Sequence, residues 1–568
     1  MIAIFAMIDY YFIPNNQVVP PFRKEGINLV IDGVVTVQKE QPKVMNGEVL
    51  LPFDTIKAKI DNNIFWDSKL EKVTVTTDNR VVRMRTGSLS ALVNNNVMTL
   101  NLPVSQNNGI ILIPINFLSD LYDIDIVYSA LNKVVIIDHK KSIVRYAVPV
   151  STSAVVRNGC SIRSPIIYKP SEFSYDVTQD NSNINGTMLR IYGAAGNWYK
   201  VRTTQGVVGF VEKRYVSIKS IKTENTIDNP QNIIWKPYRG KINLVWEMMY
   251  EGKPDLSAIK GMKGLDVISP TWFQLQNEKG DVINRSNGAY VEWAHKKGYK
   301  IWALLSNGFE GEMTGKFLSN TDYRDNLIRQ ILTYSELYKL DGINIDFEDI
   351  RLEDKPDLTQ FIREITPLLR EQGLVVSIDI NTSASYDTKA LADIADYIMV
   401  MTYDQHWRTS PVAGSVAQIT WVESLLIKYL DVIPKEKLLV GLPFYTRLWK
   451  ESTDANGNVV VSCESLKMEE ARTIIKENNA KVAWDKESGQ FYAEYKKSGA
   501  VYKIWVEDKN SLDLKSSLSL KYQLAGTAAW SRTFETPDIW ELLNSNLKEI
   551  GSYSEWALQN KNKTYVYK

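Results

Sequence analysis

From residue 241 to about residue 548, short apolar runs alternate with amphipathic stretches. The stretches have helical spacing: residues 322–338 carry an apolar stripe, and a second helix over 357–372 would end at Gly373. Near-continuous apolar strands separated by helices are typical of a parallel sheet. Eight such runs predict a closed (β/α)8 TIM barrel over 241–548. They begin near Ile242, Leu265, Tyr299, Gly342, Leu374, Tyr397, Leu438 and Leu524.

The seventh and eighth strands of this barrel are far apart in the sequence. Residues 454–515 lie between them and contain further strand-like runs (VVVS, QFYAEY and YKIWV). These runs predict an α+β insertion that borders the groove of the barrel. Residues 549–568 are interpreted as a C-terminal tail.

Residues 28–140 contain an internal repeat, in which LIPI at 112–115 follows LLPF at 50–53 with an offset of 62. Each copy predicts a strand, a short helix and a hairpin, with turns near Asp67 and Ser129. The segment is therefore expected to be an α+β repeat domain. It resembles the copper amine oxidase N-terminal-like module, a small unit found on many exported bacterial proteins, although it has no His or Cys cluster for copper.

Residues 144–219 are short alternating strands broken by polar turns, which predict a small β-barrel. The stretches YGAAGNWYKVR and GVVGFV resemble bacterial SH3-like domains, which commonly bind cell-wall peptides. Trp198 and Phe210 could either fill its core or contact a ligand. Residues 220–240 are polar, contain two prolines, and are interpreted as a linker.

The N-terminal segment, residues 1–27, begins with the apolar stretch MIAIFAMIDYYFIP, interrupted by Asp9. It is too short to cross a bilayer, which needs about 20 apolar residues. Two interpretations stay open: a disordered N-terminus, or the remnant of an export signal or membrane anchor.

Composition narrows the possible partners. Lys and Arg total 67 against 66 for Asp and Glu, so no net field recruits nucleic acid or anionic lipid. The three histidines are scattered without metal-ligand spacing, which argues against a zinc hydrolase, and neither a metal nor another cofactor is expected. The two cysteines, Cys160 and Cys463, lie in different predicted domains, so a disulfide between them is not expected.

The candidate chemistry lies in the fourth predicted strand, within the run DGINIDFE at 341–348. Alternation along a strand puts Asn344, Asp346 and Glu348 on one face and apolar residues on the other. A carboxylic acid beside another acid can serve as a proton donor near neutral pH. A solvated surface strand is the alternative, and the apolar opposite face argues against it. Asp341 points to that opposite face and is interpreted as structural.

Other predicted strands also end in polar and aromatic residues, where the active sites of such barrels lie. Carboxylates surrounded by Trp and Tyr suit a sugar, because aromatic rings cover the apolar side of a pyranose while acids bind its hydroxyls. The strand-end candidates are Trp272, Met401, Tyr403, Asp404, Tyr445, Arg447 and Trp530.

The run DGINIDFE, the later MTYD and the late Trp530 together resemble glycoside hydrolase family 18 over about 240–545, especially its spore-cortex-lytic N-acetylglucosaminidases. The resemblance implies that Glu348 is the general acid and base, and that the 2-acetamido oxygen of the substrate is the nucleophile, with retention. It implies that Asp346 orients the acetamide and that Tyr403 bonds its oxygen. Asp404 would hold neighbouring hydroxyls and Trp530 would form the pocket floor.

Asn344 departs from the family pattern, which has Asp at that position. An amide there would mimic a protonated acid and bond to Asp346, and Asp346 and Glu348 would titrate as a pair. Met401 and Asn344 are kept as binding residues. Asp404 could instead cap a helix, and Trp272 could be core. Tyr445 is kept as a ligand, although it and Arg447 are more typical of a surface at a strand end.

The predicted function is an exported hydrolase of β-1,4-linked N-acetylglucosamine polymers, in peptidoglycan or spore cortex, located at the cell envelope or outside the cell. The N-terminal domains would hold it at the cell wall. A chitinase, a non-catalytic family-18-like lectin and a wall-tethered adhesin are the alternatives, and Glu348 favours an enzyme over a lectin. Endo or exo cleavage and the oligomeric state stay open.

Overall fold

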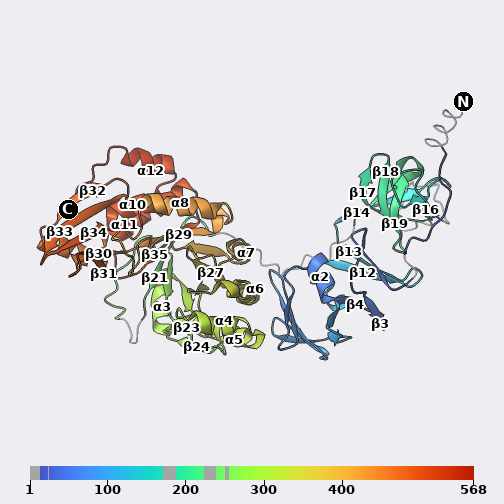
Figure 1. The fold of residues 1–568 in the computed structure, drawn as a ribbon, viewed down its shortest axis with the longest axis horizontal. Coiled ribbons are helices and arrows are strands. Elements are labelled where there is room, and N and C mark those ends of the chain that lie inside the picture. Colours follow the sequence, from blue (N-terminus) through green and yellow to red (C-terminus); the bar gives the residue numbers. More distant parts are fainter. Residues whose placement is uncertain (1–12, 23–24, 171–186, 223–237, 250–254, 568) are drawn as a thin grey trace. The chain divides into compact units, whose positions relative to one another are not determined.

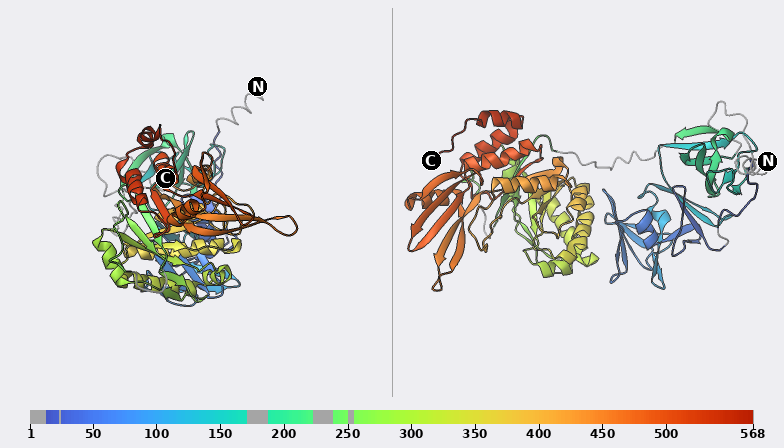
Figure 2. Two further views of the ribbon diagram at one scale, coloured as in Figure 1. Left: turned by 90° about the vertical axis from the view of Figure 1, so that its left-hand side faces the viewer. Right: turned by 45° about the horizontal axis from the view of Figure 1, so that its top comes forward.

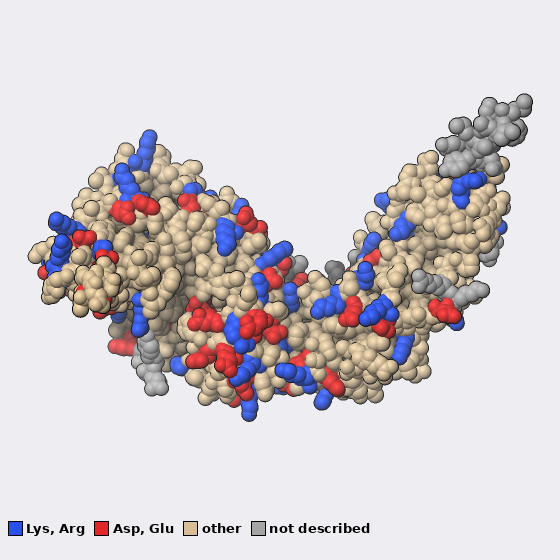
Figure 3. Space-filling model, viewed as in Figure 1, with Lys and Arg blue, Asp and Glu red and all other residues tan. Residues whose placement is uncertain are grey.

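The computed structural model describes residues 13–22, 25–170, 187–222, 238–249 and 255–567. These residues form two compact units that divide near residue 232, and each is described by itself (Figure 1). Within the described ranges, no helix is both long and apolar enough to cross a membrane. On the face drawn in Figure 3, acidic and basic side chains are interspersed, as the near-zero net charge implies.

The C-terminal unit contains a closed barrel of eight parallel strands, which confirms the predicted TIM barrel. The strands are β21 (Ile242–Glu247), β22 (Val267–Pro270), β25 (Lys300–Ser306), β26 (Gly342–Asp346), β27 (Val375–Ile380), β28 (Tyr397–Val400), β29 (Leu438–Pro443) and β35 (Gly526–Trp530). They pair in the order β22-β21-β35-β29-β28-β27-β26-β25, and pairing of β22 with β25 closes the ring. Apolar side chains fill the interior, among them Leu244, Trp302 and Met399, so the barrel is a packed core rather than a pore.

Helices pack around the barrel, as Figure 2 shows. Asn320 accepts hydrogen bonds from the N–H groups of Asp322 and Tyr323 and so begins α5. Gly373 follows α6 with φ of +76°, which confirms its predicted role at the end of that helix. The helices are α3 (Gly288–Lys296), α4 (Gly311–Leu318), α5 (Thr321–Tyr338), η3 (Leu352–Asp354), α6 (Lys355–Glu371), α7 (Thr388–Ile394), α8 (Ile419–Leu430), η4 (Lys435–Lys437), α10 (Lys509–Lys521), α11 (Asp538–Asn544) and the π-helical turn η5 (Ser545–Glu549).

The predicted insertion is present, but it begins and ends earlier than 454–515. Its five strands pair in the order β31-β30-β34-β33-β32. The first strand starts at Tyr445, directly after the barrel strand β29, because it pairs with β31 along its whole length. Residues 509–521 are a barrel helix instead, with Leu512 and Leu518 buried. The elements are β30 (Tyr445–Thr453), β31 (Val459–Lys467), α9 (Met468–Glu477), β32 (Lys481–Asp485), β33 (Gln490–Lys497) and β34 (Ala500–Val506).

The segment interpreted as a C-terminal tail is packed against the domain. Helix α12 (Tyr553–Asn560) buries Trp556, whose Nε1 donates a hydrogen bond of 2.8 Å to Asp513. Tyr565 stacks on Trp484 of the insertion, with ring centroids 3.7 Å apart. The tail interpretation is therefore wrong, and the domain extends to residue 567.

The first domain of the N-terminal unit has the predicted internal repeat. The two copies meet in an antiparallel pair between β4 (Glu48–Pro52) and β11 (Ile110–Pro114), in which Leu51 faces Ile113, its counterpart in the repeat. Both copies contribute to one apolar core. The other elements are β1 (Asn28–Ile31), β2 (Val34–Thr36), β3 (Lys43–Met45), α2 (Phe53–Lys59), β5 (Phe65–Asp67), β6 (Lys72–Thr76), β7 (Val81–Arg85), β8 (Ser90–Val93), β9 (Asn96–Thr99), β10 (Ser105–Asn107), η1 (Ile115–Leu118), β12 (Ile124–Ser129) and β13 (Val134–His139).

The second domain of this unit is a seven-stranded sheet, in the order β16-β15-β19-β18-β17-β14-β20. Trp198 is buried and Phe210 is partly exposed. Val18 pairs with Ile166, so residues 13–22 belong to this domain, whereas residues 1–12 and most of the predicted linker lie outside the described residues. The strands are β14 (Ile143–Pro149), β15 (Val156–Arg157), β16 (Ile166–Tyr168), β17 (Leu189–Ala195), β18 (Trp198–Arg202), β19 (Val208–Glu212) and β20 (Val216–Lys222), with a short helix η2 (Lys213–Tyr215).

Candidate active site

Asn344 is the fixed centre of the polar row at the carboxyl end of β26. Its side chain is fully buried. The amide oxygen accepts hydrogen bonds from Trp246 Nε1 at 2.8 Å and from Ser269 Oγ at 3.0 Å, and the amide nitrogen donates one of 2.8 Å to Asp379 Oδ1. The expected bond between Asn344 and Asp346 is therefore replaced by one to an acid on the next strand.

The register between β26 and β27 explains that contact. Asn344 pairs with Ser377 and Ile345 pairs with Ile378. Continuing this parallel register places Asp379 beside Asp346 and Asn381 beside Glu348. Asn381 is also hydrogen-bonded to its neighbour: its Nδ2 donates to Glu348 Oε2 at 3.1 Å. The active site is thus a double row of polar groups on two adjacent strands.

Asp346 and Asp379 form a pair of adjacent acids, of which Asp379 is buried and Asp346 is half-buried at the cavity. Burial raises the pKa of Asp346 well above its usual value, and the charges of Asp379 and Glu348 raise it further. Burial also raises the pKa of Asp379, but hydrogen bonds from Asn344 and Trp246 counteract that rise. Among the described residues, Asp346 Oδ1 has no hydrogen-bond partner. Two adjacent carboxylates in such a site cannot both stay ionised, so the pair shares a proton.

The side chain of Asn307 fixes the backbone of Glu348. Asn307 accepts a hydrogen bond from the Glu348 N–H at 3.0 Å and donates one of 2.7 Å to its carbonyl oxygen. Burial raises the pKa of the Glu348 carboxyl, the bond from Asn381 lowers it, and the charges of Asp349 and Asp404 raise it again. The net rise favours a protonated carboxyl, which is the form that a general acid requires.

Replacing Asn381 with Ala is expected to raise the pKa of Glu348 further. The amide hydrogen bond stabilises the ionised carboxylate, so its loss favours the protonated form. The alkaline limb of kcat/KM, on which activity falls as Glu348 loses its proton, should shift to higher pH. A pH–rate profile tests this, with Asn456→Ala on the exposed insertion hairpin as a control. A limb that stays in place or moves to lower pH would contradict the assignment.

Tyr403 and Asp404 follow β28 and lie in a cluster of aromatic rings. Tyr403 packs edge-on against both Trp246 and Tyr445, with ring centroids 6.4 and 6.2 Å apart. Burial raises the pKa of Tyr403 well above its usual value, so its hydroxyl stays a hydrogen-bond donor. Asp404 Oδ1 accepts hydrogen bonds from Tyr445 Oη at 2.6 Å and Arg447 Nη2 at 2.7 Å.

These contacts correct two interpretations of the sequence. Tyr445 and Arg447 are each 6% exposed, so the prediction that they are surface groups is wrong. Asp404 does not cap a helix, because α8 begins at Ile419 and is preceded by Gln418. Instead, Tyr445 and Arg447 position the Asp404 carboxylate, whose side chain remains 44% exposed toward solvent.

The tryptophans divide between pocket and core. Trp530 lines the cavity and packs against Trp246, with ring centroids 6.2 Å apart. Trp272 is fully buried against Tyr290, so its proposed role as a sugar platform is wrong and it is a core residue. Met401 is 8% exposed and lies under the rim at the end of β28.

The cavity at this end of the barrel has a volume of about 490 Å³. One wall is a hairpin that the sequence analysis missed, formed by β23 (Phe273–Leu275) and β24 (Val282–Asn284). Glu348 lies two residues beyond Asp346 on the same face and is partly exposed. The lining residues are Met248, Met249, Thr271, Phe273, Gln274, Arg285, Leu304, Ser306, Gly308, Phe309, Asp346 and Trp530.

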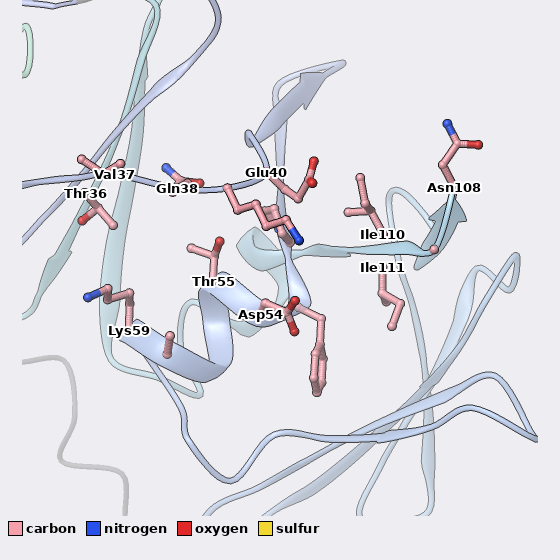
Figure 4. Close-up of a pocket in the computed structure, with 15 residues that line it drawn as sticks. Thr36, Val37, Gln38, Glu40, Asp54, Thr55, Lys59, Asn108, Ile110 and Ile111 are labelled. Carbon is pink, nitrogen blue, oxygen red and sulfur yellow. The ribbon is translucent and has the colours of Figure 1, made fainter.

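A second cavity, of about 420 Å³, lies in the N-terminal repeat domain (Figure 4). It is bounded by residues 36–40, by one side of α2 and by residues 108–111. Its charged groups are acids and lysines from separate elements, such as Glu40 and Lys59, and it has no row of acids on one strand. The barrel cavity is therefore the candidate active site.

Asp341 has the structural role expected of it. Its carboxylate accepts hydrogen bonds from Lys300 Nζ at 2.8 Å and from the N–H of Ile301 at 2.9 Å, and it lies 2.8 Å from His295 Nε2. These contacts join the start of β26 to β25 and α3.

A closed parallel barrel whose carboxyl end carries a glutamate of raised pKa, two adjacent acids and an aromatic-lined cavity is typical of a TIM-barrel glycosidase. Comparison with known families gives the particular class. Residues 262–535 match the sequence profile of Glycosyl hydrolases family 18, and residues 30–137 match that of the Copper amine oxidase N-terminal domain. The C-terminal barrel thus contains a region that matches glycosyl hydrolase family 18.

Individual relatives are distant. The uncharacterized glycosylase YvbX of Bacillus subtilis (strain 168) is 27% identical over 292 residues, which cover 48% of this chain and 82% of that protein. The cortical fragment-lytic enzyme of the same organism is 24% identical over 261 residues, which cover 44% of this chain and only 60% of that enzyme.

Solved structures of similar fold include one from Desulfitobacterium hafniense. The C-terminal domain of a candidate chitinase from Desulfitobacterium hafniense DCB-2 has a TM-score of 0.50 and 24% identity. The match covers 54% of this chain and 100% of that chain. At this identity, the similarity concerns the fold alone.

Proposed function

We propose that the barrel hydrolyses β-1,4 bonds in N-acetylglucosamine polymers, with the 2-acetamido group of the substrate as nucleophile. The observation that carries this proposal is the absence of an accessible second carboxylate beside Glu348 on the described part of β27. Asp379 is 1% exposed and both of its oxygens accept hydrogen bonds, from Asn344 and Trp246. This buried and fully bonded acid is unsuited to attack an anomeric carbon, and the resemblance to glycoside hydrolase family 18 implies that the acetamide oxygen of the substrate does so instead.

The reaction then needs two steps. Glu348 donates its proton to the glycosidic oxygen as the bond from that oxygen to the anomeric carbon breaks, and the acetamide oxygen bonds to the same carbon. In the second step, Glu348 takes a proton from water, the water oxygen attacks the anomeric carbon, and the oxazolinium ring reopens. The sugar keeps its configuration because two inversions occur.

Asp346 orients the acetamide N–H and stabilises the positive charge of the oxazolinium ion. It must be ionised to do so, and Asp379 beside it is the group that can accept its proton. Tyr403 donates its hydroxyl hydrogen to the acetamide oxygen, and Asp404, positioned by Tyr445 and Arg447, binds sugar hydroxyls. Trp530 covers the apolar face of the ring.

The substrate we favour is peptidoglycan, including spore cortex, because a relative is named a cortical fragment-lytic enzyme. Chitin is the alternative polymer. We also propose that the protein is exported and that its N-terminal unit attaches it to the cell wall. The match of residues 30–137 to the Copper amine oxidase N-terminal domain supports export, since modules of this kind occur on many exported bacterial proteins.

Release of reducing ends from purified substrates tests this function. The full chain should release reducing N-acetylglucosamine ends from cortex peptidoglycan, from vegetative peptidoglycan or from chitin oligomers. Mass analysis of the products will then show which bond is cleaved. A protein that binds these polymers but releases no reducing end from any of them would be a lectin, and the proposal would be wrong.

A further inference from the structure

The hairpin β23–β24 is labelled in Figure 1, and its residues Phe273 and Gln274 line one wall of the active-site cavity. The hairpin is attached to the barrel by pairing of β23 with β25, in which Gln274 faces Ser306. Ser306 in turn pairs with Asp346. Gln274 thus lies two strands from Asp346, about 10 Å away at the usual strand spacing.

Arg285 directly follows β24 and lines the same cavity. Its Nη2 donates a hydrogen bond of 3.3 Å to Gln274 Oε1, and its backbone N–H donates to the carbonyl oxygen of Trp272 at 2.9 Å. No acidic side chain of the described residues forms an ion pair with its guanidinium. Other arginines around the barrel, such as Arg324 and Arg370, are paired with Glu364 and Asp396. Among the described residues, Arg285 is therefore a partly buried cation whose guanidinium keeps donors without an acidic partner.

The cavity around this arginine favours an anion. Arg285 and Asp346 are the two charged groups among the described residues that line it, and Arg285 is the single cation. A guanidinium binds a carboxylate through two parallel hydrogen bonds, which gives both affinity and geometric selectivity. With a neutral glycan bound, the free N–H groups of Arg285 would have only water as a hydrogen-bond partner.

We propose that Arg285, positioned by Gln274, binds a carboxylate on the sugar unit next to the one held at Asp346. This inference rests on the proposed function and specifies its substrate class: an acidic glycan of the peptidoglycan type rather than neutral chitin. The carboxylate has two possible sources with the same chemistry. One is the lactyl group of a muramic acid, and the other is a peptide attached to that group.

Matched tetrasaccharides of alternating N-acetylglucosamine and N-acetylmuramic acid test the inference with the full chain. One has free lactyl carboxylates, a second has them converted to neutral methylamides, and a third carries L-alanyl-D-glutamate on each lactyl group. In the wild type, kcat/KM for the correct acidic substrate should exceed that for the methylamide roughly 10- to 100-fold, the usual range for a charge-assisted hydrogen bond. The acidic substrate with the higher ratio identifies the source of the carboxylate.

In Arg285→Gln the ratio of the two kcat/KM values should fall to near one. In Arg285→Lys, which keeps the positive charge but cannot form two parallel hydrogen bonds, the ratio should be intermediate. Arg329→Gln, on the exposed face of α5, is the control and should keep the wild-type ratio. A wild-type ratio near one, or a ratio unchanged in Arg285→Gln, would overturn the inference while the hydrolase function stands. Failure to hydrolyse any of the three substrates or chitin oligomers would instead refute the proposed function.

Discussion

Replacing Glu348 with Gln is expected to lower kcat roughly 10²–10⁴-fold, the range typical of a lost general acid. Gln has nearly the same shape and can still accept the hydrogen bond from Asn381, but it has no proton to give to the leaving oxygen. Substrate affinity should change little, because Asp346, Asp404 and Trp530 remain in place. The variant should therefore bind oligosaccharide without turning it over.

Steady-state kinetics and calorimetric titration with a substrate oligomer measure the two effects separately. Glu353→Gln is a matched control, since Glu353 is an exposed acid on the short helix η3 after the same strand. It should behave as the wild type. If Glu348→Gln keeps a kcat within a few-fold of the wild type, another group donates the proton and the assignment is wrong.

The second large effect is expected for Asn344→Asp. This change places a third carboxyl against Asp379 and Asp346 and removes the amide that donates to Asp379. An uncompensated buried charge destabilises a protein by about 3–5 kcal/mol. The new acid would have a pKa above its value in the unfolded chain, so the native state would bind more protons. The loss of stability should therefore be small at low pH and grow as pH rises.

A charge swap distinguishes this electrostatic effect from a loss of packing. Asn344→Asp combined with Asp379→Asn restores one acid and one amide to the same two positions. Thermal unfolding at several pH values should show most of the stability recovered, and kcat should rise above that of Asn344→Asp alone. A double variant no better than the sum of its single changes would mean that the two side chains do not act as a pair.

The barrel could be predicted from the sequence because its strands are buried on both faces and appear as isolated apolar runs. The boundaries of the insertion could not be predicted, because the run from Leu438 serves first as a barrel strand up to Pro443 and then, from Tyr445, as a strand of another sheet. The C-terminal helix was missed for a related reason. Trp556 is buried and Tyr565 is half-buried by distant parts of the chain, and no local pattern marks them.

The sequence likewise predicted some residues of the candidate site and missed others. Asn344, Asp346 and Glu348 follow from alternation along one strand. Asp379 was missed because its importance depends on the register between two strands, although the alternation in VVSIDI does place Ser377 and Asp379 on one face. Arg285 had no signal in the sequence, since its position in the cavity depends on a hairpin folded back onto β25.

The most direct test of the central claim, that the acetamide group of the substrate is the nucleophile, is inhibition by a thiazoline analogue of N-acetylglucosamine. This compound mimics the cyclised intermediate, and such mimics bind at least about 100-fold more tightly than substrate. The account predicts competitive inhibition, with an inhibition constant well below KM. Hydrolysis that continues at an unchanged rate in the presence of saturating thiazoline would contradict it.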